Sequence, residues 1–128
     1  MVLGVGIDLV RTARLREALA RHGDRLAHRV FTAAERAACA RKADPVPCLA
    51  MRFAAKEAFA KALGTGMRTP IHWQDVEVGN DQRGKPLITL SQRAAAWCAE
   101  RGVTRWHLSL TDDGDYGAAI VVVEGEER

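Results

Sequence analysis

The stretch "RFAAKEAFAKALGTG", residues 52–66, is the part of the sequence that decides the predicted fold. On a helical wheel at about 100° per residue, small apolar side chains fill one broad arc. Arg52 and Lys56 share one edge of that arc, and Glu57 and Lys61 lie roughly 140° further round. The pattern predicts a helix whose apolar side packs into a core and whose surface carries two separate polar spots.

The same stretch ends on Gly64-Thr65-Gly66, and glycine accepts the left-handed backbone conformations that end helices. Three further helices are expected from periodicity and capping signals. They are residues 11–28 with a candidate break at Gly23, a helix that opens on the capping box Thr32-Ala-Ala-Glu35 and ends at Pro45 and Pro47, and a helix from Ser91 to Arg101 that Gly102 ends.

Strands are expected on both sides of these helices. They are residues 2–10 as a short buried strand, 75–78 and 87–90 as a hairpin with a long loop, and 106–110 and 116–123 joined by the turn 111–115. Because strands and helices do not alternate regularly, the order favours an α+β fold with an antiparallel sheet over a doubly wound parallel one. A chain of 128 residues is expected to form one domain, residues 1–128.

The composition is that of a globular protein, with 48% apolar and 27% charged residues. No apolar run approaches the roughly 20 residues of a spanning helix, and the first apolar stretch has no basic leader, so a cytoplasmic location without membrane contact is expected. The three cysteines, Cys39, Cys48 and Cys98, are widely spaced and are not paired with histidines. We therefore expect small apolar core residues rather than disulfides or a zinc site.

The net charge is only +3, so the distribution of the charge matters more than its size. On one continuous helix, five arginines would share an arc of about 80°: Arg11, Arg14, Arg21, Arg25 and Arg29. This stripe is either a solvated face or a docking surface for an acidic partner. The chain has a single Tyr and no aromatic residues between these arginines, so an acidic protein ranks above RNA or DNA.

Asp8 interrupts an otherwise apolar strand, where an unpaired carboxylate costs several kcal/mol. It either caps the following helix or meets a cation. Glu57 either pairs with Lys61 along the helix, worth about 0.2–0.5 kcal/mol, or converges with Asp8. Two converging carboxylates would suit Mg²⁺, which uses one or two carboxylates together with waters and substrate phosphates. Lys61 would then point toward those phosphates.

Several blocks, taken together and in order, resemble bacterial holo-acyl-carrier-protein synthases. The blocks are Gly4-Val5-Gly6-Ile7-Asp8, Phe31-Thr32 with Glu35, residues 52–66, Gly84-Lys85-Pro86, and His107-Leu108-Ser109-Leu110. The resemblance implies a short, single-domain 4′-phosphopantetheinyl transferase of fatty acid biosynthesis. It also implies a homotrimer with active sites between subunits. Such an enzyme transfers 4′-phosphopantetheine from coenzyme A to a serine of apo acyl carrier protein and releases adenosine 3′,5′-bisphosphate.

The resemblance also implies roles for individual residues. Asp8 and Glu57 match the Mg²⁺ ligands, and Lys61 matches the lysine that meets the coenzyme A phosphates. These three are the expected catalytic residues. The turn Gly64-Thr65-Gly66 is expected to let backbone approach the nucleotide.

Other matches complete the expected site. His107 matches a position near the nucleotide of the neighbouring subunit, and Arg52 is expected to meet coenzyme A. Arg52 and Lys56 could also meet carrier protein or solvent. The general base is expected to be a metal-bound water, with Glu57 and Asp112 as alternatives. Asp112 departs from the commoner family pattern, which has histidine there, and a solvated turn carboxylate is an equal interpretation.

The same resemblance implies a partner for the arginine stripe. In the family, the acidic carrier protein docks on the first helix. Arg14, Arg21 and Arg25 are the expected docking residues. Two other functions stay open on the residues alone. A nucleotide-binding regulatory module would need Lys61 and the glycines without a shared metal, and a nucleic-acid-binding protein would need only the arginines.

Overall fold

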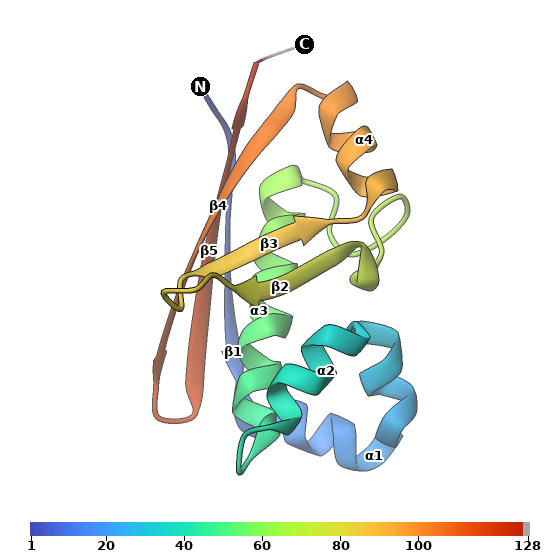
Figure 1. Cartoon of the computed structure of the whole chain (residues 1–128), viewed down its shortest axis with the longest axis vertical. Helices are drawn as coiled ribbons and strands as arrows, with labels where there is room; N and C mark the ends of the chain where they lie inside the picture. Colours follow the sequence, from blue (N-terminus) through green and yellow to red (C-terminus); the bar gives the residue numbers. More distant parts are fainter. Residues whose placement is uncertain (127–128) are drawn as a thin grey trace.

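A long helix, α3 (Pro45–Leu63), lies along the inner face of a three-stranded antiparallel sheet in the computed structural model (Figure 1). The sheet has the order β1 (Val2–Arg11), β5 (Tyr116–Gly125), β4 (Val103–Asp113). The structure describes residues 1–126, so the last two residues of the expected domain lie outside it. The α+β fold with antiparallel pairing is confirmed.

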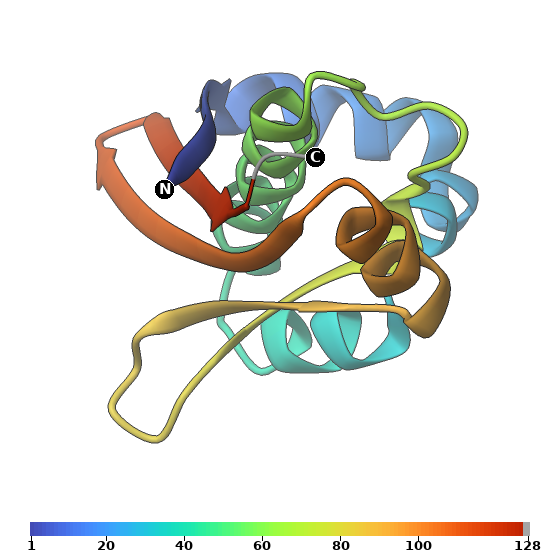
Figure 2. The same ribbon diagram turned by 90° about the horizontal axis from the view of Figure 1, so that it is seen from above.

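The remaining elements surround α3 (Figures 1 and 2). They are α1 (Thr12–Val30), α2 (Ala33–Ala40), the short 3₁₀ turn η1 (Trp73–Asp75), the hairpin β2 (Val76–Asn80) and β3 (Pro86–Leu90), and α4 (Gln92–Glu100). Helices α1 and α2 gather at one end of the molecule and α4 lies at the other. No helix within residues 1–126 is long and apolar enough to cross a membrane.

Most of the local sequence signals are confirmed. The capping box at Thr32 and Glu35 is formed, and α1 is interrupted at Gly23, where φ is 61° and ψ is −147°. The expected end of α2 at the prolines is wrong, because α2 ends at Ala40 and Pro45 opens α3. Proline has no N–H to donate and its fixed φ suits the first helical turn, so it starts helices as readily as it stops them.

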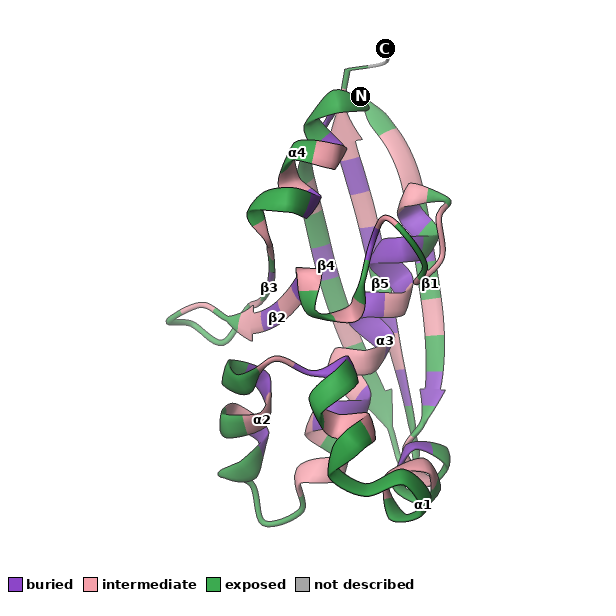
Figure 3. Ribbon diagram, turned by 90° about the vertical axis from the view of Figure 1, so that its right-hand side faces the viewer, coloured by how far each residue is buried: buried purple, intermediate pink, exposed green. Residues whose placement is uncertain are grey.

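The expectation that β1 is a buried strand is also wrong. Val5, Ile7 and Leu9 are 56%, 63% and 67% exposed, because the helices of the described chain cover only the other face of the sheet (Figure 3). Ile120, which pairs with Ile7 in the neighbouring strand, is 40% exposed on the same side. The apolar residues of β1 therefore point to both faces of the sheet, and the outer face is left uncovered in the single chain.

Two glycines set the distance between β1 and α3. A Cβ atom at Gly6 would lie 1.9 Å from the Ala58 carbonyl oxygen, and one at Gly4 would lie 2.0 Å from the Ala62 carbonyl oxygen. No side chain larger than hydrogen fits at either position without moving the strand away from the helix. The alanines of the helix provide the matching flat surface, and both Ala58 and Ala62 are buried.

The expected cysteine chemistry is wrong for two of the three residues. Cys39 of α2 and Cys48 of α3 form a disulfide with a Cα–Cα distance of 5.5 Å, whereas Cys98 is a buried free thiol as expected. The two helices fold back on each other through the loop 41–44, and this packing brings the cysteines together. Their spacing alone does not show it.

Lys56 is buried in the core. The contacts expected for it, with coenzyme A, carrier protein or solvent, are therefore not available to its side chain within this chain. Its ammonium and the Glu35 carboxylate are fully buried and 2.8 Å apart. The lysine Nζ also donates to the carbonyl oxygens of Trp73 at 2.8 Å and Val76 at 2.6 Å, so all three of its protons have an acceptor. Desolvation lowers the pKa of Lys56, and the Glu35 carboxylate only partly offsets this effect.

Removing one partner of this pair should be severely destabilising. Lys56→Met would leave the Glu35 carboxylate buried without its cation, which costs about 3–5 kcal/mol of the free energy of unfolding. Urea denaturation followed by circular dichroism measures the change. The matched control is Lys42→Met at an exposed loop position, expected within about 0.5 kcal/mol of the parent. Equal stability of the two variants would contradict the role assigned to Lys56.

Candidate functional site

Asp8, Glu57 and Lys61 converge where β1 crosses α3. The Lys61 Nζ donates to the Asp8 carboxylate at 3.0 Å and to the Ile7 carbonyl oxygen at 3.0 Å. The Asp8 side chain is only 15% exposed, whereas that of Lys61 is 50% exposed. Of the two interpretations open for Asp8, the meeting with a cation is the one observed. The start of α1 receives a different carboxylate, because Asp115 Oδ1 accepts from the Ala13 N–H at 3.2 Å.

Glu57 lies beside Asp8 but does not share its ion pair. Burial raises the pKa of Glu57, the neighbouring Asp8 carboxylate raises it further, and Lys61 works in the opposite direction. Lys61 forms its salt bridge with Asp8 and not with Glu57. Of the two interpretations open for Glu57, the pair with Lys61 along the helix is not formed: Lys61 pairs with Asp8 of the strand, and Glu57 is left as a carboxylate that repels its neighbour.

Two adjacent carboxylates of this kind fit a divalent cation. Within residues 1–126 no group of three or more His, Cys, Asp or Glu side chains is placed to hold a metal ion. The chain therefore offers Asp8 and Glu57 without a complete cage. Mg²⁺ ordinarily takes one or two carboxylates and fills its other positions with water and phosphate oxygens, so this donor set suits it.

The turn after α3 leaves open space beside its backbone, but its amide groups are already hydrogen-bonded. Gly64 ends the helix with φ of 79°, and a Cβ atom there would meet nothing within 4 Å. The N–H groups of Thr65 and Gly66 both point back to the Ala60 carbonyl oxygen, at 3.1 and 3.3 Å. A ligand at this turn would thus use the open space over Gly64, since these two amides are already bonded.

Arg52 lies away from this group, on the side of α3 that faces α2 and the hairpin. Its guanidinium donates to Cys48 Sγ at 3.1 Å and to Asn80 Oδ1 at 3.4 Å. Its Nε is buried without a hydrogen-bond partner, and burial lowers the pKa of the guanidinium. Arg52 lines a groove of about 360 Å³ together with Glu77, Asn80 and other residues of α2, β2 and β3.

His107 occupies the uncovered outer face of the sheet, in β4. Its Nε2 lies 2.5 Å from Glu124 Oε1 of β5, and the pKa of Glu124 is held below its usual range by this contact. Asp8 is on the inner face, so the sheet separates the two residues within one chain. Asp112 belongs to β4 rather than to the turn, and it is exposed.

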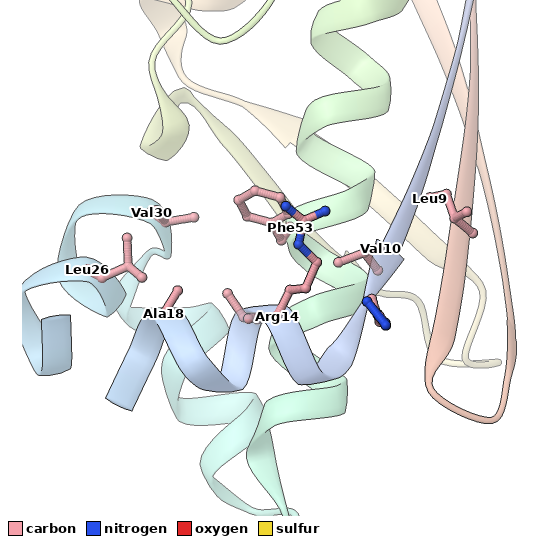
Figure 4. Close-up of a pocket in the computed structure, with 9 residues that line it drawn as sticks. Leu9, Val10, Arg14, Ala18, Leu26, Val30 and Phe53 are labelled. Carbon is pink, nitrogen blue, oxygen red and sulfur yellow. The ribbon is translucent and has the colours of Figure 1, made fainter. Parts of the chain in front are cut away.

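The break at Gly23 divides the arginine stripe that is expected for one continuous helix. Arg14 lies at the edge of a hollow of about 430 Å³ whose apolar lining includes Val10, Leu26 and Phe53 (Figure 4). Arg25 lines a second hollow of about 400 Å³ with His22, Leu26 and Arg29. Arg21, just before the break, is exposed. An apolar hollow thus lies beside Arg14, whereas the hollow at Arg25 is lined mainly by basic side chains.

Comparison with known proteins identifies the family. The family model of the 4′-phosphopantetheinyl transferase superfamily matches residues 4–121. The chain belongs to this superfamily. It is 48% identical to the holo-[acyl-carrier-protein] synthase of Laribacter hongkongensis over 98% of this chain and 100% of that protein. The corresponding protein of Trichlorobacter lovleyi is 47% identical over 97% of this chain and 98% of its own length.

Solved structures of the superfamily share the fold over nearly the whole chain. The crystal structure of the Neisseria meningitidis holo-[acyl-carrier-protein] synthase has a TM-score of 0.92 and 38% identity, covering 97% of this chain and 99% of that one. That of the Helicobacter pylori enzyme in complex with coenzyme A has a TM-score of 0.84 and 28% identity, covering 94% and 99%. The resemblance inferred from the sequence blocks is thereby confirmed.

Some contacts of the site residues have no signal in the sequence. Glu124 is a neighbour of His107 only through the register of β4 and β5, and Cys48 meets Arg52 one helical turn away. The sequence signal at Glu35 indicates only a capping box. In the structure the same carboxylate also pairs with Lys56 and accepts a hydrogen bond from the Val78 N–H at 2.7 Å. Only the contact between Cys48 and Arg52 could be expected from the sequence, because residues four apart on a helix are neighbours.

The ionised Glu57 carboxylate is expected to destabilise the folded chain, because burial and the Asp8 carboxylate disfavour its charge. Because its pKa is raised in the folded chain, its contribution to stability is fully present below the unfolded pKa and is lost as pH rises through the folded value. Glu57→Gln should therefore raise the melting temperature at pH 7 in a chelating buffer, with the difference shrinking toward pH 4. Added Mg²⁺ should raise the melting temperature of the parent more than that of the variant.

Glu17→Gln, at an exposed position of α1, is the control for loss of one negative charge. It should leave both the melting temperature and its response to Mg²⁺ unchanged. A Glu57→Gln variant that melts below the parent at pH 7 without divalent cations would contradict the electrostatic account.

Proposed function

We propose that this chain is a holo-acyl-carrier-protein synthase (EC 2.7.8.7) that acts as a single domain, residues 1–128, in the cytoplasm. It transfers 4′-phosphopantetheine from coenzyme A to a serine of apo acyl carrier protein in fatty acid biosynthesis and releases adenosine 3′,5′-bisphosphate. The observation that carries the proposal is the convergence of Asp8, Glu57 and Lys61 in a chain that is 48% identical to a curated holo-[acyl-carrier-protein] synthase. A relative with coenzyme A bound supports the donor substrate.

Asp8 and Glu57 are the proposed ligands of the Mg²⁺ ion. Asp8 and Glu57 would hold Mg²⁺, which when bound neutralises charge on the diphosphate and orients the reacting groups. Lys61 fixes Asp8 through its 3.0 Å contact and keeps one of its three protons for a phosphate oxygen. Its half-exposed ammonium is placed to reach a ligand in solvent, unlike the buried Lys56.

The proton of the attacking serine needs an acceptor close to the same group. Of the two carboxylates, Glu57 is the one not bonded to Lys61, so one of its oxygens is free to accept a hydrogen bond from the serine hydroxyl or from a water beside it. Asp112 is exposed in β4 and is the weaker candidate. We therefore assign the proton to a Glu57 carboxylate oxygen or to water that it orients.

Arg52 is proposed to bind an anionic group of coenzyme A in the groove between α2 and the hairpin. Its guanidinium lacks a carboxylate partner within 4 Å in residues 1–126, and its buried Nε has no acceptor. Such a cation lining a groove of about 360 Å³ is suited to phosphate. The Gly64-Thr65-Gly66 turn, at the far end of α3, is proposed to contact the ligand from the Lys61 side.

The uncovered face of the sheet is proposed to pack against other copies of the chain in a homotrimer. Val5, Ile7, Leu9 and Ile120 form an apolar strip there. Such a strip is unfavourable in water and marks an interface. His107 lies on the same face, so assembly would bring it close to another subunit, where we propose that it approaches the nucleotide.

The transfer itself is tested by intact mass. Incubation with coenzyme A, Mg²⁺ and apo acyl carrier protein should add one phosphopantetheine to the carrier. Asp8→Ala and Glu57→Ala should each lower the rate by at least about 100-fold, because each removes charge that positions the transferring group. Glu17→Ala is the surface control. Modification that is absent, or that both site variants leave intact, would overturn the proposal and revive a nucleotide-binding or nucleic-acid-binding role.

Carrier docking is tested by reversing charge on α1. Arg14→Glu with Arg21→Glu should raise KM for acyl carrier protein about tenfold, because the acidic partner is then repelled, while the Kd for coenzyme A stays close to the parent value. The effect should shrink at high salt. Arg25→Glu should act in the same direction, and Arg41→Glu at the end of α2 is the charge-matched control. A change confined to coenzyme A binding would rule out this docking surface.

The assembly is tested by light scattering. Ile7→Glu, which places a charge in the apolar strip, should convert a trimer to monomers and lower activity with it, because the charge cannot be desolvated at the interface. Ala37→Glu on the exposed side of α2 should leave the mass unchanged. A parent protein with the mass of a monomer would exclude the trimer.

A further inference from the structure

The disulfide between Cys39 and Cys48 lies outside the transfer site and has no part in the proposed reaction. It joins the end of α2 to the first turns of α3 across the loop 41–44. Disulfides of cytoplasmic proteins are rare and are usually transient, catalytic or redox-sensing. A pair that can open and close in that compartment requires one accessible, activated thiol and a second thiol within reach.

The surroundings of the two sulfur atoms are unequal in a way that meets this requirement. Cys39 is completely buried, whereas Cys48 is partly exposed. Arg52 Nη1 lies 3.1 Å from Cys48 Sγ, one helical turn away. A guanidinium beside a thiol favours the thiolate, which is the nucleophilic form. Arg52 has no salt bridge to a carboxylate within residues 1–126, although the Glu35 carboxylate acts on its charge at longer range.

We propose that Cys39 and Cys48 are a reversible thiol pair oxidised by hydroperoxides, with Cys48 as the attacking thiol and Cys39 as the resolving thiol. The Cys48 thiolate attacks a peroxide oxygen, the O–O bond breaks, and the departing alkoxide takes a proton to leave as alcohol. The resulting sulfenic acid is attacked by Cys39 sulfur. The S–O bond breaks, and the oxygen leaves as water with the Cys39 proton.

The balance of this sequence is two thiols oxidised by two electrons while one hydroperoxide becomes an alcohol and water. A small dithiol reverses it by thiol–disulfide exchange. Cys98 supplies a control within the same chain. It is buried, and burial raises the pKa of its thiol to about 11, so it should remain a thiol under the same treatment.

The pair is connected to the groove through Arg52. In the reduced chain a Cys48 thiolate offsets the guanidinium charge, whereas the neutral sulfur of the disulfide leaves that charge to an anion in the groove. The disulfide form should therefore bind coenzyme A more tightly, by about threefold for one partly exposed charge pair. This consequence rests on the proposed transfer from coenzyme A, whereas the oxidation itself does not.

Counting free thiols tests the oxidation. The full chain is reduced, freed of reductant, treated with one equivalent of hydrogen peroxide, and alkylated with N-ethylmaleimide in denaturant. Of the three cysteines in the sequence, all should react before oxidation and only Cys98 after it, as read by intact mass and peptide mapping. Three maleimides after peroxide, or oxidation that begins at Cys98, would overturn the proposal.

Single variants test the order of attack. With dimedone present, Cys39→Ser should accumulate a sulfenic acid adduct at Cys48, whereas Cys48→Ser should form none at Cys39. Arg52→Gln should slow oxidation about tenfold near neutral pH, because the Cys48 thiolate loses its neighbouring positive charge. Arg41→Gln, an exposed arginine near Cys39, should oxidise at the parental rate. Oxidation of Arg52→Gln at the parental rate would remove Arg52 from the mechanism.

Titration of coenzyme A into the oxidised and reduced chains tests the connection to the groove. Tighter binding by the oxidised parent, with no such difference in Arg52→Gln, is the expected result. Equal affinities of the two parental forms would overturn the connection and leave the thiol chemistry standing. Loss of transfer activity with normal thiol counts would instead concern the proposed function.

Discussion

The close contact between β1 and α3 is the constraint on which the rest of the structure depends. Glycine at positions 4 and 6 lets the strand backbone lie directly on the helix, with the Ala58 and Ala62 carbonyl oxygens where a Cβ atom would otherwise be. Asp8, two residues beyond Gly6, is thereby brought to Glu57 and Lys61. The candidate site is a by-product of this packing distance, so a larger residue in the strand would separate the carboxylates.

A second constraint holds the same helix from its other side. Glu35 bonds Lys56 and two backbone N–H groups, and Lys56 in turn bonds the carbonyl oxygens of Trp73 and Val76. This network ties α2, α3 and the start of the hairpin together, and all three protons of the Lys56 ammonium have an acceptor. Lys56 and Glu57 are adjacent in sequence, yet one belongs to the core and the other to the site, because successive residues of a helix point about 100° apart.

The chemistry is distributed over surfaces that one chain does not bring together. Asp8, Glu57 and Lys61 lie between the sheet and α3, Arg52 faces the hairpin, and His107 lies on the outer face of the sheet. An apolar strip on that outer face is consistent with a site completed by association. The Cys39–Cys48 pair adds a chemically distinct feature next to Arg52, at the other edge of the same helix.

Local signals in the sequence were sufficient for the existence of the helices and the hairpin, and for the capping box at Thr32, the break at Gly23 and the glycine end at Gly64, which act within a few residues. They were not sufficient for the boundary between α2 and α3, where the prolines open a helix instead of ending one. Motif order was likewise sufficient for the family. The sequence alone did not reveal that Lys56 is buried, that Lys61 prefers Asp8 to Glu57, or that Cys39 bonds Cys48. Each of these depends on which distant surfaces meet and at what distance, and only the packed tertiary structure decides that.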